Sequence, residues 1–294
     1  MAESELHVEN RPELTKPVLV ASFRGWNDGG QGASMATAFL NRHWRTEKFA
    51  SIDSEGFFDF QSTRPHVSLV DGTVRRIDWP ENAFSYARPP RGENHVVVLL
   101  GTEPSLRWRT FAGLVTGLAK DLGVELVVTL GALLADVPHT RPAPVTASAN
   151  DASVIDKLNV QASRYEGPTG IVGVLHDSCR AAGIPSVSLW AAVPHYVSLT
   201  PSPRAAKALC DRLATLLDVP LDTSELEEAS NAYMQQVSEA VAADEETAAY
   251  VEELEGRVDE FVEENELPSG DTLAAELTRF LRERERDEGA QGEA

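Results

Sequence analysis

Residues 96–100 read VVVLL and run directly into Gly101-Thr102-Glu103-Pro104. Five apolar residues in a row predict a strand that is buried on both faces, as the strands of a parallel sheet are. Apolar residues then recur at helical spacing and Gly123 ends the pattern; they are Phe111, Leu114, Val115, Leu118 and Leu122. Residues 124–130 predict the next buried strand, so this stretch alternates strand, helix and strand.

The same alternation extends to both sides. Upstream, residues 16–23 (KPVLVASF) predict a strand, and residues 33–44 predict a helix. Downstream, the apolar runs 171–175 and 187–193 predict two further strands, and Ser202-Pro203 has the residue types that begin a helix. An α/β fold is therefore expected, with a mostly parallel central sheet flanked by helices.

Between these elements, residues 67–70 and 73–79 favour β-structure and are joined by Asp71-Gly72. An Asp-Gly pair between two such runs predicts a β-hairpin.

Charge divides the chain of 294 residues into a body and an acidic extension. Net charge is −20 in total; residues 222–294 hold 23 acidic and 5 basic residues (net −18), which leaves 23 and 21 (net −2) for residues 1–221. We expect a loosely attached or disordered N-terminus (1–15), an α/β body (16–221), an acidic helical extension (222–283) and a frayed tail (284–294). The apolar stripe of the extension packs either on its own body or on another chain; the sequence leaves both open.

The composition of the chain indicates which classes of partner and which cellular compartment to expect. The chain has no basic footprint for nucleic acid, and its acidic extension would be repelled by an anionic membrane surface. No apolar run is long enough to span a bilayer, and the N-terminus lacks the pattern of a secretory signal. Two widely separated cysteines fit a reducing compartment, so we expect a cytoplasmic protein that binds neither nucleic acid nor membrane.

Familiar enzyme motifs are missing from the sequence. There is no phosphate-binding P-loop, no G-x-S-x-G and no H-E-x-x-H. Gly30-Gln31-Gly32 approaches a dinucleotide fingerprint, but Met35 stands where a third small residue is needed. We therefore expect no cofactor, and no metal because the available ligands do not share a metal-binding spacing.

Polar loops at the predicted strand ends supply the candidate site, because open α/β sheets bind ligands there. If these loops converge, they offer candidate catalytic residues for acid–base chemistry: Asp28, Glu103, His139 and His195. The candidate ligand-binding residues are Gly25, Trp26, Asn27, Asp28, Gly29, Gly30, Arg141, Thr169 and Tyr196. Most of the polar candidates also have a structural explanation: Asp28 as a helix cap and Glu103 beside a helix dipole. His139 could hydrogen-bond a loop carbonyl, Arg141 could pair with a carboxylate, His195 and Tyr196 could pack together, and Thr169 could serve turn geometry.

Several of these loops carry a resemblance to a known family. The segments are FRGWNDGG (23–30), VDGTVRRIDWP (70–80), LLGTEPSLRWRTF (99–111), GALLADVPHTRP (131–142), YEGPTGI (165–171) and LWAAVPHYV (189–197). In this order they resemble the proteasome assembly chaperone 2 family, in its bacterial branch, over roughly residues 16–235. The resemblance implies a three-layer sandwich similar to the phosphorylase/hydrolase fold.

The resemblance also implies relatives that act as oligomeric chaperones of proteasome α-rings. We expect a homo-oligomer, with a trimer slightly favoured over a dimer. We expect it to act as a non-enzymatic assembly or interaction protein. The alternative is a small-molecule enzyme, a hydrolase or a carboxylate–amine ligase, with its pocket at the strand ends. The chain closes on Gln291-Gly292-Glu293-Ala294 without the hydrophobic-Tyr-any docking tail of some relatives, so docking on a proteasome ring by that route is not expected.

Overall fold

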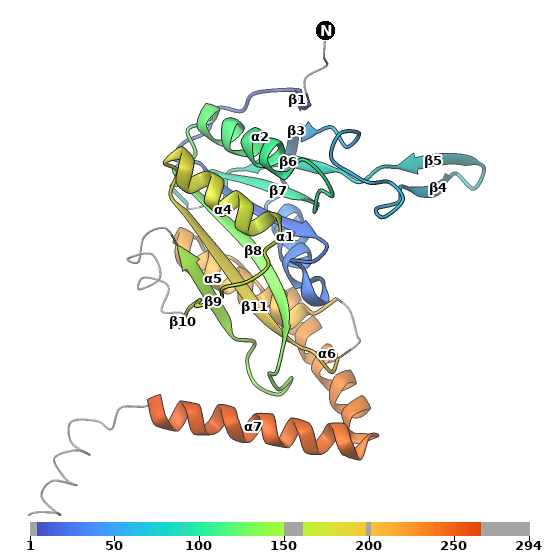
Figure 1. The fold of residues 1–294 in the computed structure, drawn as a ribbon, viewed down its shortest axis with the longest axis vertical. Coiled ribbons are helices and arrows are strands. Elements are labelled where there is room, and N and C mark those ends of the chain that lie inside the picture. The colour runs from blue at the N-terminus through green and yellow to red at the C-terminus, as the bar shows by residue number, and fades with distance from the viewer. Residues whose placement is uncertain (1–4, 91, 150–160, 198–200, 266–294) are drawn as a thin grey trace, which may run out of the picture. The chain divides into compact units, whose positions relative to one another are not determined.

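A nine-stranded sheet forms the centre of the computed structural model, which describes residues 5–90, 92–149, 161–197 and 201–265 (Figure 1). Its four middle strands are, in spatial order, β7 (Val96–Thr102), β2 (Val18–Arg24), β8 (Leu126–Ala135) and β11 (Ser186–Pro194). All three pairings among them are parallel. The prediction of a parallel sheet with continuous apolar strands is confirmed for this part.

Shorter strands extend the sheet on both sides. Next to β7 lie β6 (Asn82–Ala87), β3 (Glu47–Ile52) and β1 (Leu6–Val8), all paired antiparallel. Next to β11 lies β9 (Val145–Ala149), antiparallel to β11, and β10 (Gln161–Ala162) pairs parallel with β9. The sheet is thus parallel in its middle and mixed towards its edges.

Helices cover both faces of the sheet and complete a three-layer sandwich. One apolar core lies between the sheet and helices α1 (Gly32–His43) and α5 (Pro203–Leu217). A second core lies on the opposite face under α2 (Trp108–Asp121) and α4 (Ile171–Ala182). Successive side chains of β2 enter the two cores in turn: Val18 and Val20 enter one, Leu19 and Ala21 the other. The predicted α/β class and sandwich architecture are confirmed.

The prediction of a strand at residues 171–175 is wrong, because these residues open helix α4. The run IVGVL is short and apolar, and such a run does not distinguish a buried strand from a buried helix face. Helix α4 buries Ile171, Val172, Leu175 and Cys179, whose spacing places them along one helical face.

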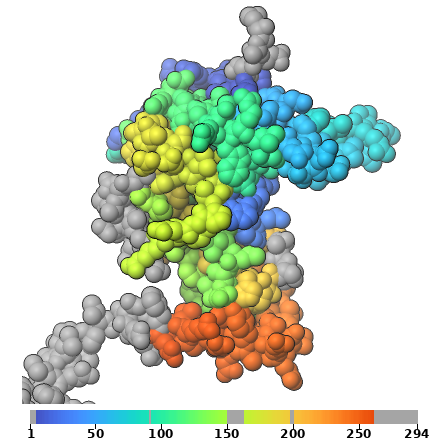
Figure 2. Space-filling view, in the orientation of Figure 1, coloured from blue at the N-terminus to red at the C-terminus, as the bar shows by residue number. Residues whose placement is uncertain are grey.

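The predicted hairpin is confirmed as strands β4 (His66–Val70) and β5 (Val74–Asp78). They form a separate two-stranded sheet that projects from the body, as the ribbon and space-filling views show (Figures 1 and 2). Asp71 and Gly72 both have positive φ at the turn, as a tight hairpin turn requires. We refer to this hairpin as the arm.

The chain divides into two compact units, residues 1–248 and residues 249–294. The first unit includes helix α6 (Ser224–Ala242), which packs on α5 and buries Leu226, Tyr233 and Val237. Helix α7 (Glu245–Asn265) lies within residues 222–283, for which an acidic helical extension is expected. The rest of the expected extension, residues 266–283, and the expected frayed tail (284–294) lie outside the described residues. The predicted boundary at Asp222 stays a prediction.

Among the residues that the structure describes, no helix combines the length and apolar character needed to cross a bilayer.

Candidate functional site

Four of the five predicted loops lie at one edge of the sheet. Residues 25–31 follow β2, Glu103 follows β7, residues 136–144 follow β8 and His195 follows β11. Because these strands are parallel, their carboxyl ends meet at the same edge. The fifth loop, residues 167–170, leads into helix α4 and also reaches this edge, beside Glu103.

The carboxylate of Glu103 holds three segments together. Its Oε1 accepts hydrogen bonds from the Asn27 side-chain amide (2.7 Å) and from the backbone N–H of Ile171 (2.8 Å). Its Oε2 accepts a longer bond from the backbone N–H of Trp26 (3.3 Å). These contacts join the β2 loop, the β7 loop and the start of α4, and we call this arrangement the Glu103 lock.

Gly170 makes the close packing of the Glu103 lock possible. A Cβ atom at this position would lie 2.6 Å from Glu103 Oε1 and closer still to the side-chain amide of Asn27. Only a residue without a side chain therefore fits between the lock and the first turn of α4. The neighbouring Thr169 places its hydroxyl oxygen against Gly173 in that turn.

Asp28 caps helix α1 from a buried position. Its Oδ1 accepts hydrogen bonds from the backbone N–H groups of Ala33 (2.8 Å) and Ser34 (3.1 Å). Burial raises the pKa of this carboxyl group above its usual value, although the hydrogen bonds from Ser34 and Ala33 act in the opposite direction. The N-terminus of helix α1 is thus satisfied by the chain's own carboxylate.

The glycines of the same loop pack it closely on its neighbours. A Cβ at Gly29 would lie 3.1 Å from the backbone of Ala132 and Leu133 in β8. Gly30 has a left-handed backbone (φ 56°), and its carbonyl accepts a hydrogen bond from Ser202 at the start of α5 (2.7 Å). Trp26, by contrast, is mostly exposed. Gly25, at φ 131°, gives the chain its turn out of β2.

A few buried polar atoms at this edge have no hydrogen-bond partner within the described structure. They include Asn27 Oδ1, Asp28 Oδ2 and both side-chain polar atoms of Asn82. Asn82 packs directly on Gly101 of β7, two positions before Glu103. The edge is therefore polar inside, but closely packed by the loops themselves.

The two candidate histidines belong to a separate group on β8 and β11. His139 is buried; its backbone N–H donates to the Tyr196 hydroxyl (2.7 Å), and its ring bonds both that hydroxyl (2.9 Å) and Ser238 of α6 (3.0 Å). His195 pairs with Asp136 at the surface (3.1 Å). These contacts tie the loops after β8 and β11 to helix α6.

Arg204 fastens the predicted Arg141 segment to the body. The guanidinium of Arg204 donates a hydrogen bond to the backbone carbonyl of Arg141 (2.5 Å). Burial lowers the pKa of Arg204, which lies between this loop and helix α6. Arg141 therefore contributes its backbone to the fold, a role that its residue type alone does not reveal.

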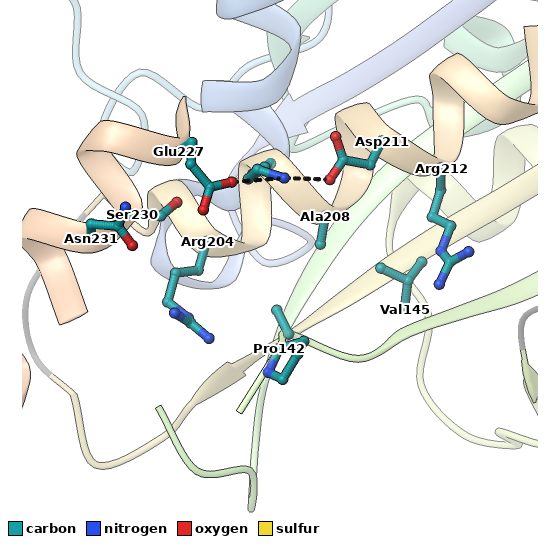
Figure 3. A pocket seen from close by; sticks show the side chains of 11 residues that line it. Pro142, Val145, Arg204, Ala208, Asp211, Arg212, Glu227, Ser230 and Asn231 are labelled. Atoms are coloured by element: carbon teal, nitrogen blue, oxygen red, sulfur yellow. Dashed lines mark hydrogen bonds and ion pairs between the residues drawn. The ribbon is translucent and has the colours of Figure 1, made fainter. Parts of the chain in front are cut away.

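A groove of about 480 Å³ lies between this loop, α5 and α6, and sequence reasoning did not find it (Figure 3). Lys207 bridges two carboxylates here, Asp211 at 2.8 Å and Glu227 at 3.0 Å. The hydrogen bond to Asp211 raises the pKa of Lys207, so this amine stays protonated and is a poor nucleophile. The pair at positions 207 and 211 has the i, i+4 spacing of a helix, but nothing in the sequence connects it to Glu227.

In the described parts of the chain, no group of three or more His, Cys, Asp or Glu residues is placed to hold a metal ion.

The fold and this edge together define a class, a three-layer α/β sandwich whose strand-end loops are fastened to one another by buried polar side chains. The chain belongs to the PAC2 family, whose sequence model matches residues 22–241. The resemblance to this family that the sequence motifs indicate is therefore confirmed.

Solved structures agree with this assignment. A PAC2 family protein from Streptomyces avermitilis is 48% identical (TM-score 0.74; 80% of this chain and 99% of that chain covered). The proteasome-assembly chaperone homologue Rv2125 of Mycobacterium tuberculosis is 45% identical, with the same TM-score and coverage. PbaB of Pyrococcus furiosus, an archaeal proteasome activator, is 18% identical and shares the fold (TM-score 0.65; 80% and 97% covered). Among curated proteins, no significant match is found.

Proposed function

We propose that this chain is a non-enzymatic, homo-oligomeric assembly or interaction protein of the proteasome assembly chaperone type. Membership of the PAC2 family supports this proposal, as does 45% identity to a protein described as a proteasome-assembly chaperone homologue. The proposal concerns what the chain binds, namely other copies of itself and proteasome-related protein subunits.

The observation that carries the proposal is the Glu103 lock. Glu103 is the carboxylate best placed for chemistry at the sheet edge, yet both its oxygens accept hydrogen bonds from the chain itself. A general acid or base needs an atom free to reach the substrate proton. A carboxylate used in this way fixes loop geometry, as a rigid binding surface requires.

The distribution of the other candidates points the same way. An enzyme site needs its acid, base and anion-binding groups around one position. Asp28 bonds to the first turn of α1, His139 bonds to Tyr196 and Ser238, and His195 bonds to Asp136. The alternative of a hydrolase or a carboxylate–amine ligase therefore receives less support from the geometry, because the groups are distributed over separate contacts.

The test is a binding experiment with the full chain. Purified chain is mixed with unassembled proteasome α-type subunits from the same source, and complexes are separated by native electrophoresis and identified by mass spectrometry. We expect the chain alone to migrate as an oligomer and to form a complex with unassembled subunits. A chain that is monomeric at tens of micromolar and binds none of them would contradict the proposal.

A further inference from the structure

The arm carries a continuous apolar surface on one of its two faces. Alternate residues of a strand point to the same face, and the register pairs Val67 with Ile77 and Leu69 with Arg75. Trp79 continues the same side beyond Ile77. We call Val67, Leu69, Ile77 and Trp79 the apolar arm face; all four side chains are at least half exposed.

The opposite face of the arm is polar for most of its length and is satisfied internally. The carboxylate of Asp78 accepts hydrogen bonds from Ser68 (2.8 Å) and from Arg76 (2.7 Å). These bonds lower the pKa of Asp78, so the carboxylate stays ionised and the two strands stay joined. The arm is therefore amphipathic, with one solvated face and one face that needs cover.

An amphipathic ribbon of two strands is marginally stable in water unless its apolar face packs on something. At its base the arm is held by Phe60, whose ring lies 4.8 Å from that of Trp79. Beyond this contact the apolar arm face is exposed throughout the described structure. Contiguous exposed apolar surface is typical of interaction sites, protein interfaces among them. Another copy of the same chain can supply this cover at fixed stoichiometry.

A matching surface lies at the carboxyl edge of the sheet. Leu133 and Leu134 are neighbours in β8, so their side chains point to opposite faces, yet both are exposed. The end of β8 thus stands clear of both helix layers. Asp136 follows it; its carboxylate lies 3.1 Å from His195, and its side chain is still mostly open to solvent. We call Leu133, Leu134 and Asp136 the strand-end patch.

Charge favours contact between these two surfaces. The arm, residues 66–78, contains two arginines and two aspartates, so it is neutral in a chain whose net charge is −20. Arg75 lies on the apolar arm face, directly across from Leu69. The strand-end patch offers two leucines and a carboxylate, so it complements the arm in both polarity and sign.

We infer that the arm of one copy lays its apolar face on the strand-end patch of a second copy, with Arg75 towards Asp136. This inference rests on the proposed homo-oligomer and names its interface. The two surfaces differ, so the contact is heterologous, and a heterologous contact closes into a ring when the rotation between copies allows it. A ring is the arrangement that the expected trimer requires.

The first experiment changes one arm face at a time in the full chain. Leu69→Asp and Ile77→Asp place a charge on the apolar arm face, and Val74→Asp places the same charge on the opposite face. The three side chains are matched in exposure, at 61%, 56% and 62%. Sedimentation velocity at tens of micromolar measures the association state, and circular dichroism checks that each variant is folded.

We expect Leu69→Asp and Ile77→Asp to weaken association at least about tenfold, and Val74→Asp to leave it unchanged. If the unaltered chain is an oligomer and all three variants associate like it, the inference is overturned while the proposed function stands. If the unaltered chain is a monomer, the homo-oligomer of the proposed function fails as well. The two failures are therefore distinguishable.

The second experiment identifies which surfaces meet. A chain with Leu69→Cys and a chain with Leu134→Cys are treated with a short bis-maleimide, separately and mixed. The native Cys179 and Cys210 are buried and do not contribute. We expect a covalent product of twice the 31.9 kDa chain mass in the mixture alone. Equal cross-linking in the Leu69→Cys chain by itself would show arm-to-arm pairing and would overturn the inference, as would an oligomer that gives no product.

Discussion

The side-chain amide of Asn27 donates a 2.7 Å hydrogen bond to Glu103, 76 positions further along the chain. This bond connects the loops that follow β2 and β7, which are neighbouring parallel strands. Ile171 shares the same carboxylate oxygen, so a third segment depends on it. Removal of this one carboxylate therefore affects three loops at once.

Glu103→Ala is expected to lower the free energy of unfolding by about 1–3 kcal/mol, because it leaves buried donors of Asn27 and Ile171 without an acceptor. Urea unfolding followed by circular dichroism measures this. The exposed Glu166→Ala is the control and is expected to change little. Equal stability of the two variants would show that the Glu103 lock is not structural.

Gly170→Ala is expected to destabilise the chain by about 1–3 kcal/mol, because its Cβ would press on Glu103 and Asn27. Gly117→Ala is the matched control. Gly117 lies inside helix α2 with open space around it, and alanine there is expected to stabilise by about 0.5–1 kcal/mol. Thermal or urea unfolding of both variants gives the two signs. A neutral Gly170→Ala would contradict the close packing described for the lock.

The stability of Asp28→Asn relative to the unaltered chain should depend on pH. Burial raises the pKa of Asp28, so the folded state favours the protonated carboxyl. The stability that the protonated carboxyl contributes is fully present below the ordinary pKa of 3.8. It is lost as pH rises through the raised pKa of the folded state. The side chain at this position does not titrate in the Asp28→Asn variant. The free energy of unfolding of the variant, relative to that of the unaltered chain, should therefore rise with pH through this window and stay constant above it.

Asp59→Asn is the control for this titration. Hydrogen bonds from Gln61 and Ser62 lower the pKa of Asp59, so its ionised form stabilises the fold above its ordinary pKa. The free energy of unfolding of Asp59→Asn, relative to that of the unaltered chain, should therefore fall as pH rises, which is opposite to the expectation for Asp28→Asn. Urea midpoints measured between about pH 3 and pH 7 decide the signs. Parallel curves for the two variants would refute the assignment for Asp28.

The two cysteines should be unreactive in the folded chain. Both are buried, and burial raises the pKa of Cys179 to about 12 and raises that of Cys210 as well. The thiolate is the reactive form, so a thiol reagent such as Ellman's should react slowly in buffer and with two thiols per chain in urea. Rapid reaction of one thiol in buffer would mean that a core opens near that residue.

Truncation tests the predicted boundary at Asp222. A chain that ends at Leu221 is expected to fold as an α/β body, but with lower stability, because α5 loses the cover of Leu226, Tyr233 and Val237. A chain that ends at Asp244 keeps α6 and is expected to unfold at a higher urea concentration. Sedimentation of both shows whether the acidic helices contribute to association. An insoluble or uncooperative shorter chain would place the boundary after α6.

The central strands could be predicted because each is mostly apolar along its length, and the hairpin because Asp-Gly fixes its turn. Residues 171–175 open helix α4 although the sequence predicts a strand there, because IVGVL is too short to show a helical period. The Glu103 lock could not be predicted for a different reason. The order of strands in the sheet brings Asn27, Glu103 and Ile171 together, and no local sequence pattern shows which distant loops lie at the same edge. His139 was identified as a candidate, but its partner Ser238 lies on a helix that had been assigned to the extension.

The arm leaves the sheet and returns to it at nearly one point. Ile52, the last residue of β3, is paired with Asn82, the first residue of β6, and Phe60 against Trp79 closes the base of the excursion. The segment between those two rings can therefore change in length or sequence without disturbing the pairing of β3 with β6. On the arm interface inferred above, two chains with the same sandwich but different arms would assemble separately, and the change would be confined to the fewer than twenty positions between Phe60 and Trp79.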